Sequence, residues 1–240
     1  MRPIFLIGVL ILFAAPAAAD TGYLYKTKLV QAAPGKLLDL IELYKSRVAT
    51  DKAIGDESPF WMRHSQGDRW DLLLLYPMGS YSEYYSVDRI ARRKSAEQTD
   101  FDERLKTMIA WQEDIFVYGP PLDIVRKSFA DMAFFHVEIF QSLAGKHSAL
   151  QKEREMENAY LKALNRPEGL IFVRDQGAAW DIFTIGIYRN LKHYAESADI
   201  QEKDQQAAAR KAGFDSPAQI GPYLRTLISI HHDTLCVAIK

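Results

Sequence analysis

The short sequence Gln-Gly-x-x-Trp-Asp occurs twice in this chain of 240 residues, at 66–71 and again at 176–181. The spacing of 110 residues extends well beyond the motif. Without any gap, residues 31–84 and 141–194 share twelve identities in 54 positions, whereas average composition would give about three by chance. Further along the offset becomes 119, and four residues match in register: Leu105/Leu224, Thr107/Thr226, Ile109/Ile228 and Asp114/Asp233. Two copies at so long a period exclude a solenoid and predict the duplication of a whole domain of about a hundred residues.

Each copy is predicted to contain the same elements in the order β-α-β-β-α-β. Alternating β-branched and aromatic residues indicate strands, and apolar residues at helical spacing indicate helices. Gly67 and Gly177 are predicted to form the turn between the second and third strands. The aspartates that end the two motifs, Asp71 and Asp181, are expected to bond to nearby backbone amides. The expected strands are 22–31, 60–65, 70–76 and 114–118, then 133–141, 170–175, 180–188 and 234–239; the expected helices are 34–48, 80–92 and 100–112, then 146–164, 191–212 and 217–230.

This order is that of the ferredoxin-like split βαβ unit. Gly119-Pro120-Pro121 interrupts the chain directly after the first copy, where a connection is needed. We therefore expect an α+β protein of two tandem ferredoxin-like repeats, at 20–119 and 133–240, joined by a linker at 120–132. The two repeats are expected to form a pseudo-dimer within one chain.

The N-terminus has the pattern of a signal peptide. Met1-Arg2 is followed by an apolar run over 4–13 and by an alanine-rich segment that ends at Ala19. Small residues at positions −3 and −1 favour cleavage after Ala19, so residues 1–19 are expected to be removed and the protein to be periplasmic or secreted. An apolar run of this length is too short for a membrane-spanning helix, which needs about 20 residues. A buried N-terminal helix is the alternative.

Composition limits the possible partners. The net charge is −1 and charges of both signs are interspersed, so no basic face for nucleic acid is indicated. After removal of the signal peptide no membrane contact is expected, and the chain is expected to be a monomeric pseudo-dimer or a homodimer. Cys236 is the only cysteine and lies in an apolar, strand-like run, which favours a small buried side chain over a reactive thiol.

Two repeats of this kind, with helices on one side of each sheet, resemble the dimeric α/β-barrel superfamily. The resemblance covers nearly all of 22–239 and rests on element order and repetition. Relatives with this fold include quinol-type antibiotic monooxygenases, muconolactone isomerases and haem proteins similar to chlorite dismutase. The resemblance implies a cavity between sheet and helices or inside the barrel, but no particular activity, because one fold supports many functions.

The first strand of each repeat supplies the main candidates for chemistry. Tyr25, Thr27 and Leu29, like their counterparts 135, 137 and 139, are expected on the face that packs against helices. The opposite face carries Lys26 and Lys28 in the first repeat, and His136 and Glu138 in the second; these four are expected to face the barrel interior or its rim. His136 and Glu138 are candidates for an acid–base pair or for two of three metal ligands. The alternative is a structural ion-pair network in which Lys26 and Lys28 meet Glu138.

Other candidates are more isolated. His64, Arg174 and Tyr76 are proposed to contact a ligand. His193 is the one histidine onto which the resemblance could place the axial ligand of a haem. The run His231-His232-Asp233 is expected at the junction of a helix and the last strand, where neighbouring side chains point to opposite faces.

The chain contains no GxGxxG, P-loop, HExxH, CxxC or GxSxG motif, which disfavours nucleotide binding and covalent serine or cysteine catalysis. Three functional hypotheses remain. The first is an exported protein that binds a small apolar or aromatic molecule in a barrel cavity, with no cofactor. The second is an enzyme, either a cofactor-independent monooxygenase or isomerase or a haem protein. The third is a structural or interaction protein without a ligand.

Overall fold

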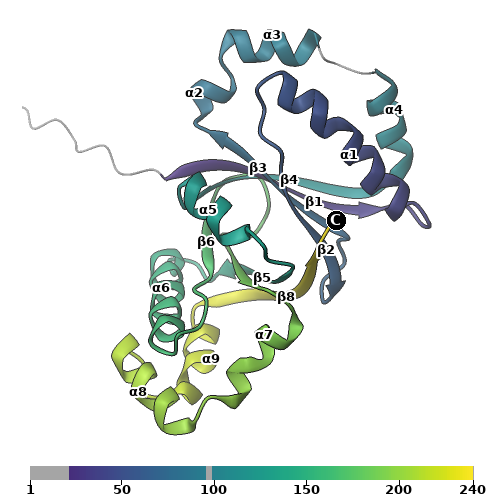
Figure 1. Ribbon diagram of the computed structural model, residues 1–240. Coiled ribbons are helices and arrows are strands. Elements are labelled where there is room, and N and C mark those ends of the chain that lie inside the picture. Colours follow the sequence, from purple (N-terminus) through teal and green to yellow (C-terminus); the bar gives the residue numbers. More distant parts are fainter. Residues whose placement is uncertain (1–21, 96–98, 240) are drawn as a thin grey trace, which may run out of the picture.

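The computed structural model describes residues 22–95 and 99–239. Within these ranges eight strands form a closed antiparallel barrel in the order β1-β3-β2-β8-β5-β7-β6-β4 (Figure 1). β2 pairs with β8, and β4 pairs with β6, so two seams join the first half of the chain (22–119) to the second half (133–239). The strands are β1 Tyr23–Ala32, β2 Phe60–Gln66, β3 Leu72–Gly79, β4 Ile109–Gly119, β5 Phe134–Ser142, β6 Leu170–Gln176, β7 Ile182–Tyr188 and β8 Ile228–Ala238.

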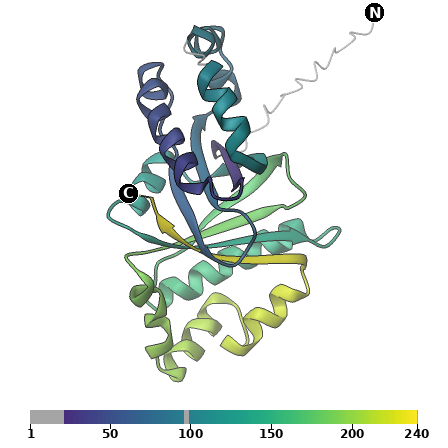
Figure 2. The same ribbon diagram turned by 90° about the vertical axis from the view of Figure 1, so that its right-hand side faces the viewer.

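Helices cover the barrel on two opposite sides. Those of the first half lie on one side and those of the second half on the other, as Figure 2 shows from a second direction. Around the barrel, the four strands of each half follow the same order, which is the α+β arrangement expected for the dimeric α/β-barrel fold. The helices are α1 Leu37–Ala53, α2 Tyr81–Tyr84, α3 Val87–Ser95, α4 Thr99–Met108, α5 Leu122–Phe129, α6 His147–Ala163, α7 Leu191–Ala195, the 3-10 helix η1 Glu196–Asp199, α8 Glu202–Ala212 and α9 Pro217–Arg225.

The barrel interior is a continuous apolar core built by both halves. Its buried side chains include Tyr25, Leu29, Phe135, Val137, Ile139, Phe172, Phe183 and Cys236. Lys26, Lys28, His136 and Glu138 alternate with these residues along β1 and β5 and therefore lie on the outer face, beneath the helices. Their expected position, facing the barrel interior or its rim, was wrong. Burying four ionisable side chains in an apolar core would cost too much free energy, so the apolar residues take the interior.

The repeated motif forms two equivalent hairpin corners. Gly67 and Gly177 have positive φ angles of 123° and 100°, and a Cβ at Gly67 would lie 2.1 Å from a carbonyl oxygen of β8. The carboxylates act as expected: Asp71 accepts a hydrogen bond from the amide of Ala32 (2.8 Å), and Asp181 accepts one from the amide of Ser142 (2.8 Å). The motif thus ties each hairpin to the end of the first strand in its own half.

The connection between the halves contains a helix. α5 places Val125, which is fully buried, against the barrel core together with Leu122 and Phe129. The hydroxyl of Tyr25 donates a hydrogen bond to the carbonyl of Pro120 (2.7 Å). Residues 120–132 therefore pack onto the barrel rather than only joining its two halves.

Several boundaries differ from the expected ones. Residues 109–112 and 228–230, which were expected in helices, lie in β4 and β8, and His231-His232-Asp233 lies inside β8 rather than at its junction with a helix. The segment 191–212 is divided among α7, η1 and α8, and the helix expected from Pro34 begins at Leu37. The helix start expected at Pro217 is confirmed, and Gly213 ends α8 in the left-handed region (φ 97°).

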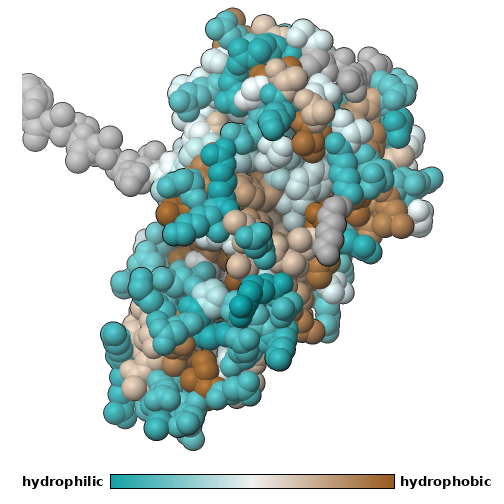
Figure 3. Space-filling model, viewed as in Figure 1, coloured by the Kyte–Doolittle hydropathy of each residue, from teal (hydrophilic) through white to brown (hydrophobic). Residues whose placement is uncertain are grey.

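Within residues 22–95 and 99–239 no helix is long and apolar enough to cross a membrane. The expected signal peptide, 1–19, lies outside the described residues. On the face shown in Figure 3, hydrophilic residues cover much of both helical layers, and apolar residues show between them around the middle of the molecule.

Candidate functional site

Two crevices lie between the barrel and its helices, one in each half. The second-half crevice has a volume of about 240 Å³, somewhat below the roughly 300–1,000 Å³ of sites for drug-sized molecules. A ligand that fills it is therefore small. Its lining is mainly polar and aromatic: His136, Glu138, Arg154, Glu157, Asn158, Leu161, Arg166, Gly169, Thr184, Gly186, Tyr188, Tyr194 and Ser197.

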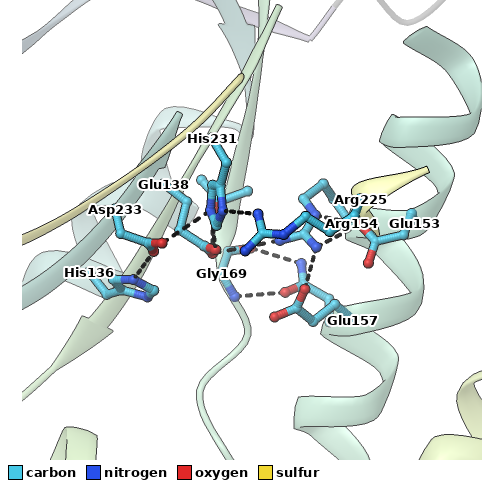
Figure 4. Close-up of polar contacts among 11 residues, drawn as sticks. His136, Glu138, Glu153, Arg154, Glu157, Gly169, Arg225, His231 and Asp233 are labelled. Atoms are coloured by element: carbon cyan, nitrogen blue, oxygen red, sulfur yellow. Dashed lines mark hydrogen bonds and ion pairs between the residues drawn. The ribbon is translucent and has the colours of Figure 1, made fainter. Parts of the chain in front are cut away.

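Two neighbouring strands supply a cluster of imidazoles and carboxylates. Because β5 and β8 pair with Glu138 opposite Asp233, residues at alternate positions of both strands reach the same outer face. His136 Nε2 donates to Asp233 Oδ1 (2.8 Å), and His231 Nε2 lies 3.2 Å from Glu138 Oε1 and 3.4 Å from Asp233 Oδ2. Arg225 Nη1 lies 3.2 Å from His231 Nδ1. An arginine can only donate, so Nδ1 accepts and the proton of His231 is on Nε2. Figure 4 shows the contacts of this cluster.

Helix α6 adds a buried guanidinium to this cluster. Arg154 is almost fully buried, and its Nη2 lies 2.6 Å from Glu153 Oε2 and 2.5 Å from Glu157 Oε2. Its Nη1 lies 3.6 Å from Glu138 Oε2, so the same side chain links helix and strand. Figure 4 shows Arg154 between the carboxylates of α6 and those of the strands. Buried charges of this kind are stable only when they are paired.

The pKa values in this cluster are shifted in opposite directions. Burial raises the pKa of Glu157 to about 7, because the nearby carboxylates of Glu138 and Glu153 add to the effect and Arg154 opposes it only in part. Burial alone would raise the pKa of Glu138 as well, but the hydrogen bond from His231 and the charges of His136 and Arg154 lower it. Two carboxyl groups in one crevice thus differ in protonation near neutral pH: Glu157 can exchange a proton there, whereas Glu138 stays ionised.

His136, one of the two histidines of the cluster, favours its charged form. Burial lowers the pKa of His136, but the hydrogen bond to Asp233 and the charges of Glu138 and Asp233 raise it above its usual value. The hydrogen bond from His136 is also the main reason why the pKa of Asp233 is lowered. Burial raises the pKa of Tyr188 to about 12, so that this side chain stays a neutral donor at the crevice wall.

A metal ion has one possible position here. His136, Glu138 and Asp233 each offer a ligand atom, and these atoms lie within 4.8 Å of one another. The spacing along one strand had suggested two ligands, and the adjacent strand provides the third. Arg154 lies beside Glu138 and Arg225 beside His231, so a cation would enter a site where both carboxylates already have partners. The donor set fits a divalent ion, and the guanidinium groups of Arg154 and Arg225 oppose its positive charge.

The first-half crevice has a similar place in the fold but different chemistry. It measures about 230 Å³ and contains Lys26, Lys28 and Tyr76 among its lining residues. Lys28 Nζ lies 2.8 Å and Lys26 Nζ 3.6 Å from Asp114 Oδ1. The expected network with Glu138 was therefore wrong, since the lysines pair within their own half. Burial lowers the pKa of Lys28, against the effect of Asp114, and raises that of Tyr76.

The remaining candidates lie elsewhere. His64 and Arg174 share the inward faces of β2 and β6; His64 packs edge-on against Trp70, and Arg174 pairs with Asp181 (2.7 Å). His193 accepts a hydrogen bond at Nδ1 from the amide of Arg189 and packs against Tyr188. Its ring thus serves local contacts at the start of α7, and these surroundings do not fit an axial ligand of haem.

Sequence reasoning missed much of the second-half crevice. His231 and Asp233 were set aside because neighbouring side chains in a strand point to opposite faces, although residues at alternate positions, such as these two, share a face. Arg154 and Glu157 had only the charge of their helix to mark them. Tyr194 aligns with Tyr84 in the repeat, and both line their own crevice.

No protein-family model and no curated protein matches this chain. Among solved structures, an anthrone oxidase-like protein superposes with a TM-score of 0.56 at 11% identity and covers 92% of both chains. A monooxygenase-like protein from Fusobacterium nucleatum has a TM-score of 0.56 at 10% identity (91% of this chain, 94% of the other), and one from Lactobacillus acidophilus has 0.54 at 9% (90% and 93%). At this identity the similarity shows the fold alone.

Proposed function

We propose that this protein binds a small aromatic molecule with an acidic hydroxyl or enol group in the second-half crevice and removes a proton from it. The observation that carries the proposal is the arrangement of two carboxyl groups around one buried guanidinium: Arg154 lies beside both Glu157 and Glu138, and burial raises the pKa of Glu157 to about 7 whereas the pKa of Glu138 is lowered. A base with a pKa near the working pH is the most effective one for proton transfer. The aromatic walls Tyr188 and Tyr194 favour a flat ligand.

The residues divide into three roles under this proposal. The carboxylate of Glu157 accepts the proton from the ligand oxygen, and the ligand becomes an anion. Arg154 is buried and fixed by Glu153, so its charge can stabilise that anion without reorganisation. The His136–Asp233 pair holds the strand side of the crevice and supplies a proton when the product leaves.

The fold supports the same choice among the earlier hypotheses. The similar solved structures include an anthrone oxidase-like and two monooxygenase-like proteins. Cofactor-independent oxygenation and isomerisation both begin with deprotonation of an electron-rich ring or enol, which is the step that these residues can perform. A protein that binds the molecule without reacting with it is the simpler form of the proposal.

A coloured phenol provides a direct test. We expect 4-nitrophenol near pH 7, close to its own pKa and where Glu157 is partly ionised, to show when bound an additional absorbance band of the phenolate beyond that of the free phenol. Glu157→Gln should bind the phenol without this band, because the amide cannot accept the proton. Lys26→Gln changes the position that corresponds to His136 in the first-half crevice and serves as the matched control, so it should leave the band unchanged.

The results separate the alternatives. If the wild-type protein binds the phenol in its uncharged form, the binding site stands but the proton transfer is refuted. No binding, or equal loss of the band in Lys26→Gln, would refute the site. Unchanged melting temperatures of both variants exclude a general loss of structure.

The location and architecture of the chain belong to the same proposal. We infer that residues 1–19 direct export to the periplasm or the medium, and that the repeats at 20–119 and 133–240 act as a pseudo-dimer without further subunits. The mass of the exported protein should be that of a chain that begins at Asp20. Its native mass should be that of one chain. A mass that includes Met1 would refute the export.

A further inference from the structure

A third recess lies at one mouth of the barrel, away from both crevices. It measures about 380 Å³. Three of the four tryptophans of the chain line it: Trp70 and Trp180 from the two copies of the repeated motif, and Trp111 from β4. Large indole surfaces around a recess of this size are suited to binding a flat aromatic molecule.

The two halves contribute unequal side chains at equivalent positions of this mouth. Trp111 of β4 pairs with Gln31 of β1, and Ile230 of β8 pairs with Gln141 of β5 in the same register. Arg69 precedes Trp70 as Ala179 precedes Trp180. The first half therefore has an arginine and a tryptophan where the second half has an alanine and an isoleucine.

The larger pair fills its own part of the mouth. The guanidinium of Arg69 lies 4.6 Å from the ring centre of Trp111, so a planar cation stacks on an indole there. Ala179 and Ile230 are too small to make the equivalent stack, and both line the recess. Ile230 is 42% exposed, which leaves apolar surface open to solvent at this place.

The charges at the rim select against acids. Two carboxylates, Asp68 and Glu113, line the recess with one permanent cation, Arg69. Asp68 pairs with His232 across the seam of β2 and β8 (3.3 Å), and the charge of Arg69 lies over Trp111 on the first-half side. Glu113 also lines the recess and forms no ion pair with any residue in the part of the chain that the structure describes. Its carboxylate repels an anion and tolerates a neutral molecule or a cation.

We propose that this recess is a second binding site for a planar aromatic molecule without negative charge. The molecule lies beside Ala179 and Ile230, where the first half has the stack of Arg69 and Trp111. This site is distinct from the second-half crevice in position and chemistry, and it does not depend on the proposed proton transfer. Residues 68–70 and 179–180 of the two hairpins form this recess together with the strands β4 and β8. It therefore exists only when the two halves are assembled.

Two related dyes test the proposal. N-phenyl-1-naphthylamine is neutral, and 8-anilino-1-naphthalenesulfonate has the same aromatic skeleton with a negative charge. Both become fluorescent in an apolar site when they are excited directly. We expect the neutral dye to bind, and the sulfonate to bind several-fold more weakly.

The decisive variant is Ala179→Arg combined with Ile230→Trp, which gives the second half the residues of the first. Both positions are exposed, so the fold should tolerate the change. We expect the neutral dye to bind about tenfold more weakly or not at all. Arg69→Ala is the matched change on the other side, and it should retain or strengthen binding because it uncovers Trp111.

The proposal fails if the double variant binds the neutral dye as well as the wild type, since the dye would then occupy another place such as a crevice. Preferred binding of the sulfonate would overturn the role of Glu113. Loss of binding in Arg69→Ala would show that Arg69 holds the dye directly, and would overturn the argument from the smaller residues of the second half.

Discussion

Alanine substitution of the aspartates in the repeated motif should destabilise the protein unequally. Asp181 accepts three hydrogen bonds, from Ser142 N (2.8 Å), Ser142 Oγ (2.7 Å) and Arg174 Nη2 (2.7 Å). Asp71 accepts one, from Ala32 N (2.8 Å). The difference arises from the neighbours, because alanine replaces the serine in the first half, and the position of Arg174 is occupied there by a histidine.

The expected magnitudes follow from these contacts. A hydrogen bond to a charged group contributes about 1.5–3 kcal/mol, so Asp71→Ala should lower the free energy of unfolding by about that amount. The two bonds from Ser142 to Asp181 share one residue, and the Arg174 side chain is 31% exposed, which reduces that ion pair to about 0–1 kcal/mol. Asp181→Ala should therefore lower the free energy of unfolding by about 3–5 kcal/mol.

Urea unfolding of both variants and the wild type, followed by tryptophan fluorescence, measures the difference. Acid provides a second criterion. Burial would raise the pKa of Asp181, but the bonds from Arg174 and Ser142 lower it. Its contribution to stability is present above the unfolded pKa of about 3.9 and is lost as the pH falls through the lower folded value. Equal destabilisation by both substitutions, or an unchanged acid transition in Asp181→Ala, would refute the reasoning.

Three other measurements test separate parts of the structure. Gly67→Ala should lower the free energy of unfolding by more than about 1 kcal/mol, because its Cβ would meet the carbonyl oxygen of Asp233 at 2.1 Å; Gly35→Ala, with nothing within 4 Å, should cost less in the same urea titration. The raised pKa of His136 stabilises the folded state below the unfolded pKa of about 6.5, and this contribution is lost as the pH rises through the folded value. His136→Gln should therefore flatten the dependence of stability on pH in this range, and an unchanged slope would contradict the ion pair. Cys236 is fully buried, and burial raises the pKa of its thiol, so it should react with a thiol reagent only after unfolding; rapid reaction of the native protein would refute its burial.

The fold was largely predictable because two copies could be compared. An element indicated in both copies was correct in type in most cases, and the turn glycines 67 and 177 were identified from the repeat itself. The length of the last strand in each half was not predictable. Trp111 and Ile230 fit a helical pattern locally, but pairing with the long strands β1 and β5 extends β4 and β8 through them. Tertiary pairing overrides local propensity in such segments.

The sequence predicted which strand residues of the candidate site share a face. It did not predict whether that face points into the barrel or towards the helices. Both faces of β1 and β5 are covered, one by the barrel core and the other by helices, so alternation separates two faces without showing which is inside. His136 and Glu138 were therefore identified correctly as sharing a face, and that face was placed wrongly. Arg154 on α6 could not have been found from the sequence, because its role depends on the position of the helix over the strands.

The β2–β8 seam has a consequence for the order in which the chain can fold. β2 is complete by residue 66, but its second neighbour begins only at Ile228. During synthesis from the N-terminus, the β2 edge of the first hairpin therefore stays unpaired until residues 228–238 have been made. Open strand edges pair readily with other chains. We expect nascent or truncated forms of this protein to need a chaperone that covers this edge. Pairing of β8 with β2 should then release the chaperone.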